Sequence, residues 1–249
     1  MQDTDVYIRR TGITSYPEMP PFNPDKYYPE YPFACSKSLK DLSPPANPVY
    51  DNIRQLLFDL GLDTENFGLP CWNPLKEYIK PGNTVLLKPN IVLHENHIRH
   101  YGLDCVITNG SIIRAVCDYV YKALEGCGKI IIADAPVQAC DFKKAIKYMG
   151  LVEIQKFYMD YGFNIEIIDF RQEQAIINKR GRITGIKKLP GDPRGYTNVD
   201  LKKISMLDEL SDDYESFRVT NYDPARMMAH HNKHTHEYLI PNSVLKADV

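Results

Sequence analysis

The stretch TNGSIIRAVCDYVYKALEGCGKIIIADAP, residues 108–136, predicts a helix followed by a buried strand. Apolar side chains recur in its first half at the spacing that places them on one helix face. These are Ile112, Ile113, Val116, Val120 and Leu124. Gly126 or Gly128 ends the helix, because glycine is a common residue just past a helix C-terminus. The uninterrupted apolar run KIIIADAP that follows is typical of a strand covered on both faces.

Elements of the same kind flank this stretch. NTVLLKPNIV (83–92) and NIEIIDF (164–170) are typical of buried strands, and residues 141–162 predict one or two helices. Strand, helix, strand, helix, strand is the order of a parallel sheet with right-handed crossovers. The predicted fold class is therefore α/β, with a mostly parallel sheet and flanking helices in a Rossmann-like layering. AIINKRGRITGIKKL (175–189) adds one β-hairpin insertion that turns at residues 179–181.

The N-terminal part has a different composition. Residues 1–48 are rich in proline and tyrosine, and proline fixes φ and removes hydrogen-bond donors, so we predict an extended arm. Free disorder is one interpretation, and an arm packed through its aromatic side chains on the domain or on a partner chain is the other. Residues 49–249 are predicted to form a single α/β domain, with a helix that ends before Gly61 and a second short helix over residues 73–82.

Composition excludes several classes of function. The 30 Lys and Arg residues nearly balance the 32 Asp and Glu residues, so we expect no bulk attraction to nucleic acid or to an anionic membrane. No apolar run approaches the roughly 20 residues of a membrane span, and the polar N-terminus is no signal peptide. The six cysteines include no CxxC pair. We therefore expect a cytoplasmic protein, with no iron–sulphur cluster held by this chain alone.

The ends of the predicted strands carry the candidate catalytic residues, because open parallel sheets bind ligands at the carboxyl ends of their strands. Lys88, Pro89 and Asn90 follow the first strand, and Asp134 ends the second. A lysine here can hold a phosphate or carboxylate, or act as a base if it is desolvated. A strand-end lysine in solvent is the alternative. Asp169 and Arg171 follow the third strand and are further candidates.

Thr108, Asn109 and Ser111 open the long helix and are candidate substrate-binding residues. A helix N-terminus offers free amides and a positive dipole end, which suits an anion. The alternative is ordinary N-capping, the common role of these residue types. Neither GxGxxG nor GxxxxGK[ST] occurs, so the standard dinucleotide and P-loop signatures are missing.

The seven histidines fall into two clusters. HENHIRH contains His94, His97 and His100, and HHNKHTH contains His230, His231, His234 and His236. Neutral imidazole is the commonest metal ligand, so the second cluster is a candidate site for a divalent metal. On a strand, His234 and His236 would point to the same side. Neither cluster has a zinc-finger or HExxH spacing, and a surface loop or a contact to an anionic substrate are the alternatives.

Four segments in order resemble the bacterial and archaeal family known as domain of unknown function 362. They are VLLKPNIV, the threonine-initiated helix TNGSIIRAVCDYVYKAL, KIIIADAP and HEYLIPNSVLKADV, within residues 80–249. The resemblance implies a shared site that contains Lys88, Asn90, Thr108 and Asp134, with the His230–His236 loop near it. In the family, ADV opens a strand that leads into a Pro-Lys-x-Lys-x-His stretch, so the resemblance implies a domain that is incomplete at its C-terminus.

Three functions remain open after this comparison. The first is an enzyme that acts on a small anionic substrate, with Lys88 and Asp134 as catalytic residues and a divalent metal as a candidate cofactor. The second is a non-catalytic metal- or ligand-binding module that partners an iron–sulphur redox protein, because some relatives carry ferredoxin-type cluster domains. The third is a scaffold that forms homo-oligomers through the N-terminal arm.

Overall fold

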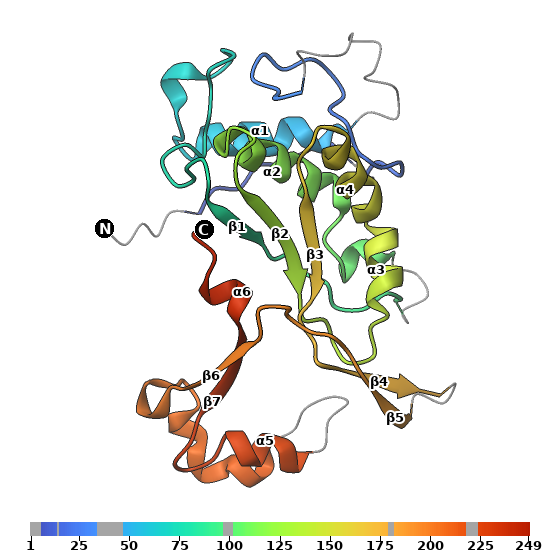
Figure 1. Ribbon diagram of the computed structural model, residues 1–249, viewed down its shortest axis with the longest axis vertical. Coiled ribbons are helices and arrows are strands. Elements are labelled where there is room, and N and C mark those ends of the chain that lie inside the picture. The colour runs from blue at the N-terminus through green and yellow to red at the C-terminus, as the bar shows by residue number, and fades with distance from the viewer. Residues whose placement is uncertain (1–5, 14, 34–46, 97–101, 179–181, 218–223) are drawn as a thin grey trace. The chain divides into compact units, whose positions relative to one another are not determined.

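The computed structural model describes residues 6–13, 15–33, 47–96, 102–178, 182–217 and 224–249 (Figure 1). They form two compact units. Unit 1 consists of Met1–Ala133, Asp141–Ile167 and Ala247–Val249, and unit 2 of Asp134–Cys140 and Ile168–Lys246. The single domain over residues 49–249 stays a prediction. Within the described residues, no helix is long and apolar enough to cross a membrane.

A three-stranded sheet forms the centre of unit 1. Its strands are β1 (Thr84–Leu87), β2 (Lys129–Asp134) and β3 (Ile165–Asp169), in the order β1-β2-β3. All three arrows point the same way in Figure 1, and the register of the parallel pair β1 and β2 runs from Thr84–Lys129 to Leu87–Ile132. From Ile130 to Ala133, every side chain of β2 is buried, as its continuous apolar run predicted. The predicted α/β class is confirmed.

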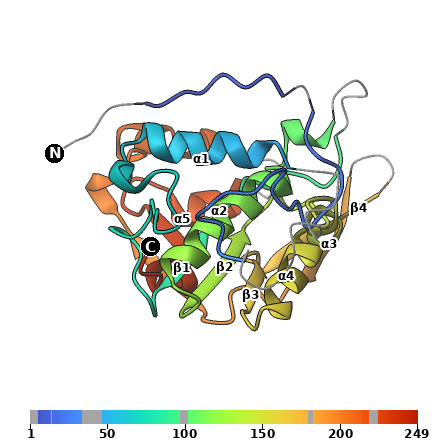
Figure 2. The ribbon, with the colours of Figure 1, turned by 90° about the horizontal axis from the view of Figure 1, so that it is seen from above.

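The described residues of unit 1 include four α-helices. They are α1 (Val49–Asp59), α2 (Gly110–Ala123), α3 (Phe142–Tyr148) and α4 (Leu151–Asp160), and α2 lies between α1 and the sheet (Figure 2). Two 3₁₀ turns, Thr64–Asn66 and Leu103–Cys105, also belong to it. Gly61 follows α1 with a φ of 79°, and Gly150 separates α3 from α4 with a φ of 66°, both conformations that glycine adopts without strain.

The short helix predicted over residues 73–82 is wrong. These residues form consecutive turns. One of them is closed by the hydrogen bond from the Tyr78 amide to the Leu75 carbonyl at 3.0 Å. Pro74 and Pro81 leave a segment too short to repay the entropy of starting a helix.

The proline- and tyrosine-rich arm contributes to the core of unit 1. The side chains of Phe22, Tyr28 and Phe33 are between 3% and 5% exposed. Tyr28 joins a buried aromatic cluster with Tyr50 of α1, Trp72, and Ala115 and Tyr119 of α2. Of the two interpretations of the arm, packing on its own unit therefore holds for the described part, and the aromatic side chains supply the apolar surface that makes it stable.

Buried charges fix the arm on the helices. Arg114 and Asp118 of α2 form an ion pair that is fully buried, and Arg114 also donates to the carbonyl oxygen of Pro21 at 2.8 Å and to the hydroxyl of Tyr31 at 2.8 Å. Tyr158 of α4 donates a short hydrogen bond to Asp118. Arg114 thus has several partners, which offsets the cost of removing it from water, whereas Oδ2 of Asp118 has no hydrogen-bond partner among the described residues.

Two glycines allow the arm to approach closely. A Cβ atom at Gly110 would lie 1.8 Å from the carbonyl oxygen of Met149 and 2.7 Å from the ring of Phe22. A Cβ atom at Gly150 would lie 2.6 Å from Pro20. Only glycine leaves room for the backbone and the arm at these two positions.

Two antiparallel pairs of strands form much of unit 2. The first pair is β4 (Glu173–Ile177) and β5 (Ile183–Lys188), and the second is β6 (Tyr196–Asp200) and β7 (Glu237–Pro241). The remaining elements are the 3₁₀ turns Lys202–Ile204 and Asp208–Ser216 and the helices α5 (Pro224–His230) and α6 (Asn242–Leu245). The predicted hairpin over residues 175–189 is confirmed as β4–β5, although its turn at 179–181 lies outside the described residues. The β6–β7 pair was not predicted.

Ala247–Val249 lies along the edge of β1. The Leu86 amide donates to the carbonyl oxygen of Val249 at 2.8 Å, and the Asp248 amide donates to the carbonyl oxygen of Thr84 at 2.9 Å. The Thr84 amide in turn donates to the Asp248 carboxylate at 2.7 Å. These residues satisfy backbone groups along the edge of β1.

Candidate functional site

The turn after β1 is bonded to the residues before α2. The amide of Asn90 donates to the Thr108 hydroxyl at 2.9 Å, and the amide of Thr108 donates to the Asn90 carbonyl at 2.9 Å. An antiparallel bridge between Ile91 and Ile107 continues the contact. Lys88 is exposed at the end of the strand. The structure therefore brings Asn90 and Thr108 together, with Lys88 two residues before Asn90, and a shared site of the three stays a prediction.

The next two residues of the predicted site have other environments. Asn109 is the N-cap of α2: its side-chain oxygen accepts from the Ser111 amide at 3.0 Å, and its side-chain nitrogen donates to Asp104 at 3.1 Å. The capping alternative is thus confirmed for Asn109. Ser111 is fully buried, and its hydroxyl has no hydrogen-bond partner among the described residues. A role for either in substrate binding stays a prediction.

Asp134 ends β2 and is 4% exposed. The Ala135 amide donates to its carboxylate at 2.9 Å, and its carbonyl oxygen accepts from the Phe170 amide at 2.9 Å. The carboxylate is therefore held in one orientation within unit 2. Its role as a base or metal ligand stays a prediction.

Arg171 organises the loop that follows Asp134. Its guanidinium group forms a two-pronged ion pair with Asp169, with a shortest distance of 2.7 Å, and donates to the carbonyl oxygens of Val137 and Cys140 at 2.9 Å each. The side chain is 3% exposed. Planar, multiple hydrogen bonding of this kind suits arginine and not lysine. The position of Arg171 after a strand was noticed in the sequence, but its carbonyl partners lie more than thirty residues away and gave no local signal.

The histidines at 230–236 form a turn between α5 and β7. His231 and His236 face each other in an antiparallel bridge, and the Asn232 amide closes the turn on the Thr235 carbonyl at 2.9 Å. His234 is exposed in this turn and His236 is 1% exposed. The expectation that these two point to the same side of a strand is wrong, because His234 precedes the strand.

The ring geometry of the four histidines is uneven. The rings of His231 and His236 stack with centroids 6.1 Å apart. Three of their ring nitrogens are buried and have no hydrogen-bond partner among the described residues: Nδ1 of His231 and both nitrogens of His236. Burial lowers the pKa of His231, and the nearby His236 and His230 lower it further. His230 instead contacts Glu237 at 2.8 Å.

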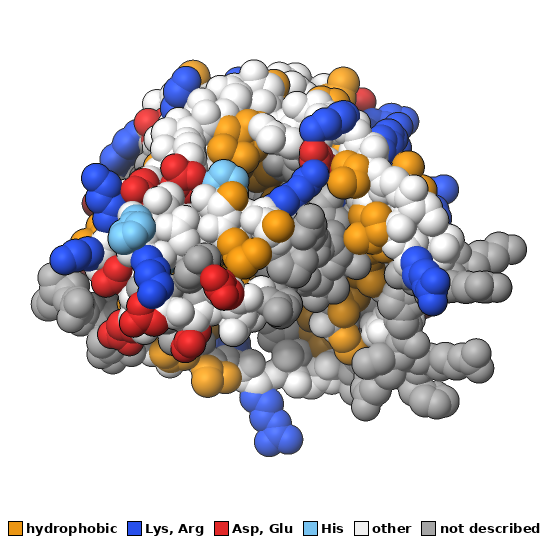
Figure 3. Space-filling model, turned by 90° about the horizontal axis from the view of Figure 1, so that it is seen from below, with side chains coloured by type: hydrophobic (Ala, Val, Ile, Leu, Met, Phe, Trp, Pro, Cys, Tyr) orange, Lys and Arg blue, Asp and Glu red, His pale blue; other side chains and the backbone are white. Residues whose placement is uncertain are grey.

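This arrangement fits a metal only in part. A metal needs ring nitrogens without hydrogen-bond partners, but of the four histidine rings only those of His231 and His236 stack on each other, and Nε2 of His236 lies 3.9 Å from Asp208. Among the described residues, no group of three or more His, Cys, Asp or Glu side chains is placed to hold a metal ion. Histidine side chains lie beside acidic ones on the face shown in Figure 3. Binding of a divalent metal by these histidines stays a prediction.

Residues 85–201 match the family model described as a domain of unknown function (DUF362). This match over residues 85–201 supports the family resemblance found in the sequence. No curated protein and no solved structure gives a significant match. The DUF362 segment contains Lys88, Asn90, Thr108 and Asp134, so the first three motifs of the resemblance lie inside it. The histidines at 230–236 and the final motif lie outside it.

His94 is the first histidine of the cluster inside the DUF362 segment. Its Nδ1 atom accepts a hydrogen bond at 2.9 Å from the amide of Asp141, the N-cap residue of α3. The imidazole thus has a structural partner in unit 1, and its proton lies on the other nitrogen when it is neutral. His97 and His100 lie outside the described residues, so the meeting of the two clusters stays a prediction.

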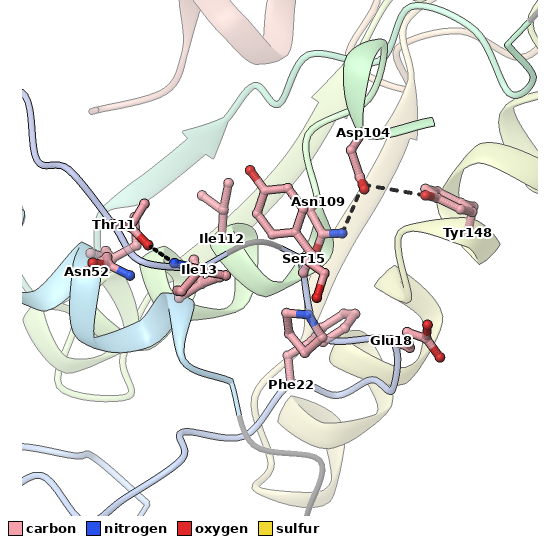
Figure 4. A pocket seen from close by; sticks show the side chains of 14 residues that line it. Thr11, Ile13, Ser15, Glu18, Phe22, Asn52, Asp104, Asn109, Ile112 and Tyr148 are labelled. Carbon is pink, nitrogen blue, oxygen red and sulfur yellow. Dashed lines mark hydrogen bonds between the residues drawn. The ribbon is translucent and has the colours of Figure 1, made fainter. Parts of the chain in front are cut away.

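A cavity of about 850 Å³ lies in unit 1 beside the start of α2 (Figure 4). Of the predicted site residues, Asn109 lines it, and Lys88, Asn90, Thr108 and Ser111 do not. The arm supplies part of its wall, which is why the sequence patterns of the sheet gave no indication of it. Figure 4 shows Asn109, Asp104 and Tyr148 joined by hydrogen bonds at one side.

Proposed function

We propose that this protein is an enzyme that binds a small anionic substrate at the carboxyl end of β1. The observation that supports this best is the pair of reciprocal hydrogen bonds between Asn90 and Thr108, at 2.9 Å each. They hold the turn that begins with Lys88 against the N-terminal end of α2. The proposal combines the positive charge of Lys88 with the positive end of the α2 dipole, and together they suit a phosphate or carboxylate.

The hydroxyl of Thr108 contributes a donor to this site. Its oxygen accepts from the Asn90 amide, and a hydroxyl group keeps one hydrogen that it can donate. Lys88 supplies the charge and Thr108 a directed hydrogen bond. Pro89 is buried and fixes the backbone between Lys88 and Asn90, so the lysine starts from a rigid base.

The catalytic part of the proposal rests on Asp134 as a general base. Its buried carboxylate is oriented by the Ala135 amide, as a positioned base requires. A divalent metal held by His230, His231, His234 and His236 would supply Lewis-acid assistance when bound. His231 and His236 are the pair best suited to it, because their buried nitrogens have no hydrogen-bond partner among the described residues, although Nε2 of His236 lies 3.9 Å from Asp208.

Anion binding is tested by titrating the full chain with inorganic phosphate and with succinate in a calorimeter. In Lys88→Gln, we expect affinity for the anion that binds to fall about tenfold, because one direct charge contact is removed. The matched control is Lys156→Gln, which removes an exposed lysine of the same unit on α4. Equal affinity of Lys88→Gln and wild type, or binding of neither anion, would contradict the proposal. An equal loss of affinity in Lys156→Gln would show that the anion responds only to the net charge of the protein.

A further inference from the structure

The cavity beside the start of α2 has two kinds of wall. One wall comes from the arm, through Ile13, Tyr16 and Phe22, and another comes from α1, through Val49 and Ile53. These side chains are apolar or aromatic and favour the hydrocarbon part of a ligand. At about 850 Å³, the cavity has the size of small-molecule sites in proteins.

The charged groups of the cavity have one sign. Glu18 and Asp104 line it, and among the described residues that line it none is Lys, Arg or His. Asn109 and Tyr148 both donate to Oδ1 of Asp104, at 3.1 Å and 3.4 Å. Oδ2 has no hydrogen-bond partner among the described residues, so it remains available to a donor on a ligand.

Aromatic rings add to this preference. Tyr16, Phe22 and Tyr148 line the same space as the two carboxylates. The face of an aromatic ring carries partial negative charge and attracts cations. Phe22 is held in place by its burial and by the close approach of Gly110, so this part of the wall is formed before a ligand arrives.

From these observations, we propose that the cavity binds a small organic cation, an amine with an apolar body. The ammonium group contacts Asp104, the apolar body lies between Ile13, Ile53 and Phe22, and Glu18 adds negative charge at another side of the cavity. This site is separate from the anion site of the proposed function and has the opposite charge. It gives the protein a second ligand, which binds through the arm.

Three matched probes test the sign of the charge. They are 3-phenylpropylamine, 3-phenylpropanol and 3-phenylpropionate, which share an apolar body and differ in the charge of the head group. Titration of the full chain at neutral pH by calorimetry or ligand-observed NMR should give an affinity for the amine about tenfold above that for the alcohol. The carboxylate should bind most weakly. Equal affinity for amine and alcohol, tighter binding of the carboxylate, or binding of no probe would overturn the proposal.

Variants locate the site. Asp104→Asn and Glu18→Gln should each lower the affinity for the amine about three- to tenfold and leave that for the alcohol unchanged. Glu18 is exposed on the arm, so its variant tests the proposal even if Asp104→Asn disturbs the fold. Glu153→Gln is the control, because it removes an exposed carboxylate of α4 in the same unit, outside the cavity. An equal loss in Glu153→Gln, or no loss in Glu18→Gln and Asp104→Asn, would overturn the assignment.

Discussion

Units 1 and 2 use charged side chains differently. In unit 1, the ion pair of Arg114 and Asp118 is fully buried inside a core of aromatic rings. In unit 2, the pairs that Glu173 forms with Lys188 and Arg226 lie on the surface of a two-stranded sheet. Ile183 and Ile186 of that sheet are 43% and 50% exposed. Both charges of the buried pair lie on α2, and Arg114 reaches the arm through its further hydrogen bonds to Pro21 and Tyr31. The comparison indicates that the buried charges are part of the packing of unit 1, whereas the surface pairs of Glu173 are open to solvent and contribute little.

The largest expected effect is in the buried pair of unit 1. Asp118→Ala leaves the Arg114 guanidinium buried without its counter-charge and should cost about 3–5 kcal/mol of unfolding free energy. The chain has a single tryptophan, Trp72, in the core of unit 1, so urea unfolding followed by its fluorescence reports on this unit.

The double variant Arg114→Met/Asp118→Leu is the control for the buried pair. Because it replaces both charges with apolar groups, it should recover most of the loss. A cost below about 1 kcal/mol in Asp118→Ala would show that the buried pair resembles a surface pair.

Glycine substitutions should also separate the units. Gly110→Ala places a Cβ atom 1.8 Å from the Met149 carbonyl oxygen and should destabilise unit 1 by about 3 kcal/mol, since backbone must move. Gly185→Ala in β5 meets only the Ile176 side chain at 3.5 Å and should change stability by under about 0.5 kcal/mol. Hydrogen exchange read by mass spectrometry measures both units. Similar protection in both variants would refute the close packing at Gly110.

The acid sensitivity of unit 2 should depend on Asp192. Burial alone raises the pKa of its carboxyl, but hydrogen bonds from Ser243 and Arg194 outweigh burial and hold the pKa below its usual range. Because the folded pKa is the lower one, the unfolded chain binds the proton more readily. The stabilisation is present above about pH 3.9 and is lost as the pH falls through the folded value.

Hydrogen exchange of peptides from residues 190–245 between pH 5 and 2.5 tests the role of Asp192. Asp192→Asn should cost about 1–2 kcal/mol at neutral pH and weaken the acid dependence of these peptides. An unchanged acid dependence in Asp192→Asn would assign the effect to other carboxylates.

The smallest expected effect is at the surface pair. Glu173→Gln breaks the contacts with Lys188, which is 82% exposed, and with Arg226, and should cost under about 1 kcal/mol. Exchange protection of the β4–β5 amides provides the measurement, with 0.5 M salt as a second condition. A loss comparable to that of Asp118→Ala would remove the distinction between the two units.

The sheet was predictable because its signals are local. KIIIADAP and the apolar face of α2 specify a buried strand and a helix from neighbouring residues alone. The packing of the arm could not be predicted from local signals, because Tyr28 and Phe33 contact side chains of α2 that follow them in the sequence by more than eighty residues. The β6–β7 pair was also missed, because YTNVD is mostly polar and resembles a loop.

The candidate site was predictable to a similar extent. Motif order predicted a site of Lys88, Asn90 and Thr108; Asn90 and Thr108 are bonded to each other, and the part of Lys88 stays a prediction. The histidine pattern misled, because HHNKHTH forms a turn that brings His231 to His236 and leaves His234 outside. The cavity could not be foreseen, because its walls come from the arm, α1 and the start of α2, and no short pattern links them.

The bond between Arg114 and the Pro21 carbonyl spans 93 residues of sequence and has a consequence during synthesis. At a translation rate of about 5–20 residues per second, the ribosome completes Arg114 roughly 5–20 seconds after Pro21. Over that interval, the aromatic side chains around Tyr28 lack the part of their native surface that Ala115 and Tyr119 of α2 provide. A newly made arm is therefore a natural target for chaperones that bind exposed apolar segments, and the nascent chain stays vulnerable to proteases until α2 and α4 have been made.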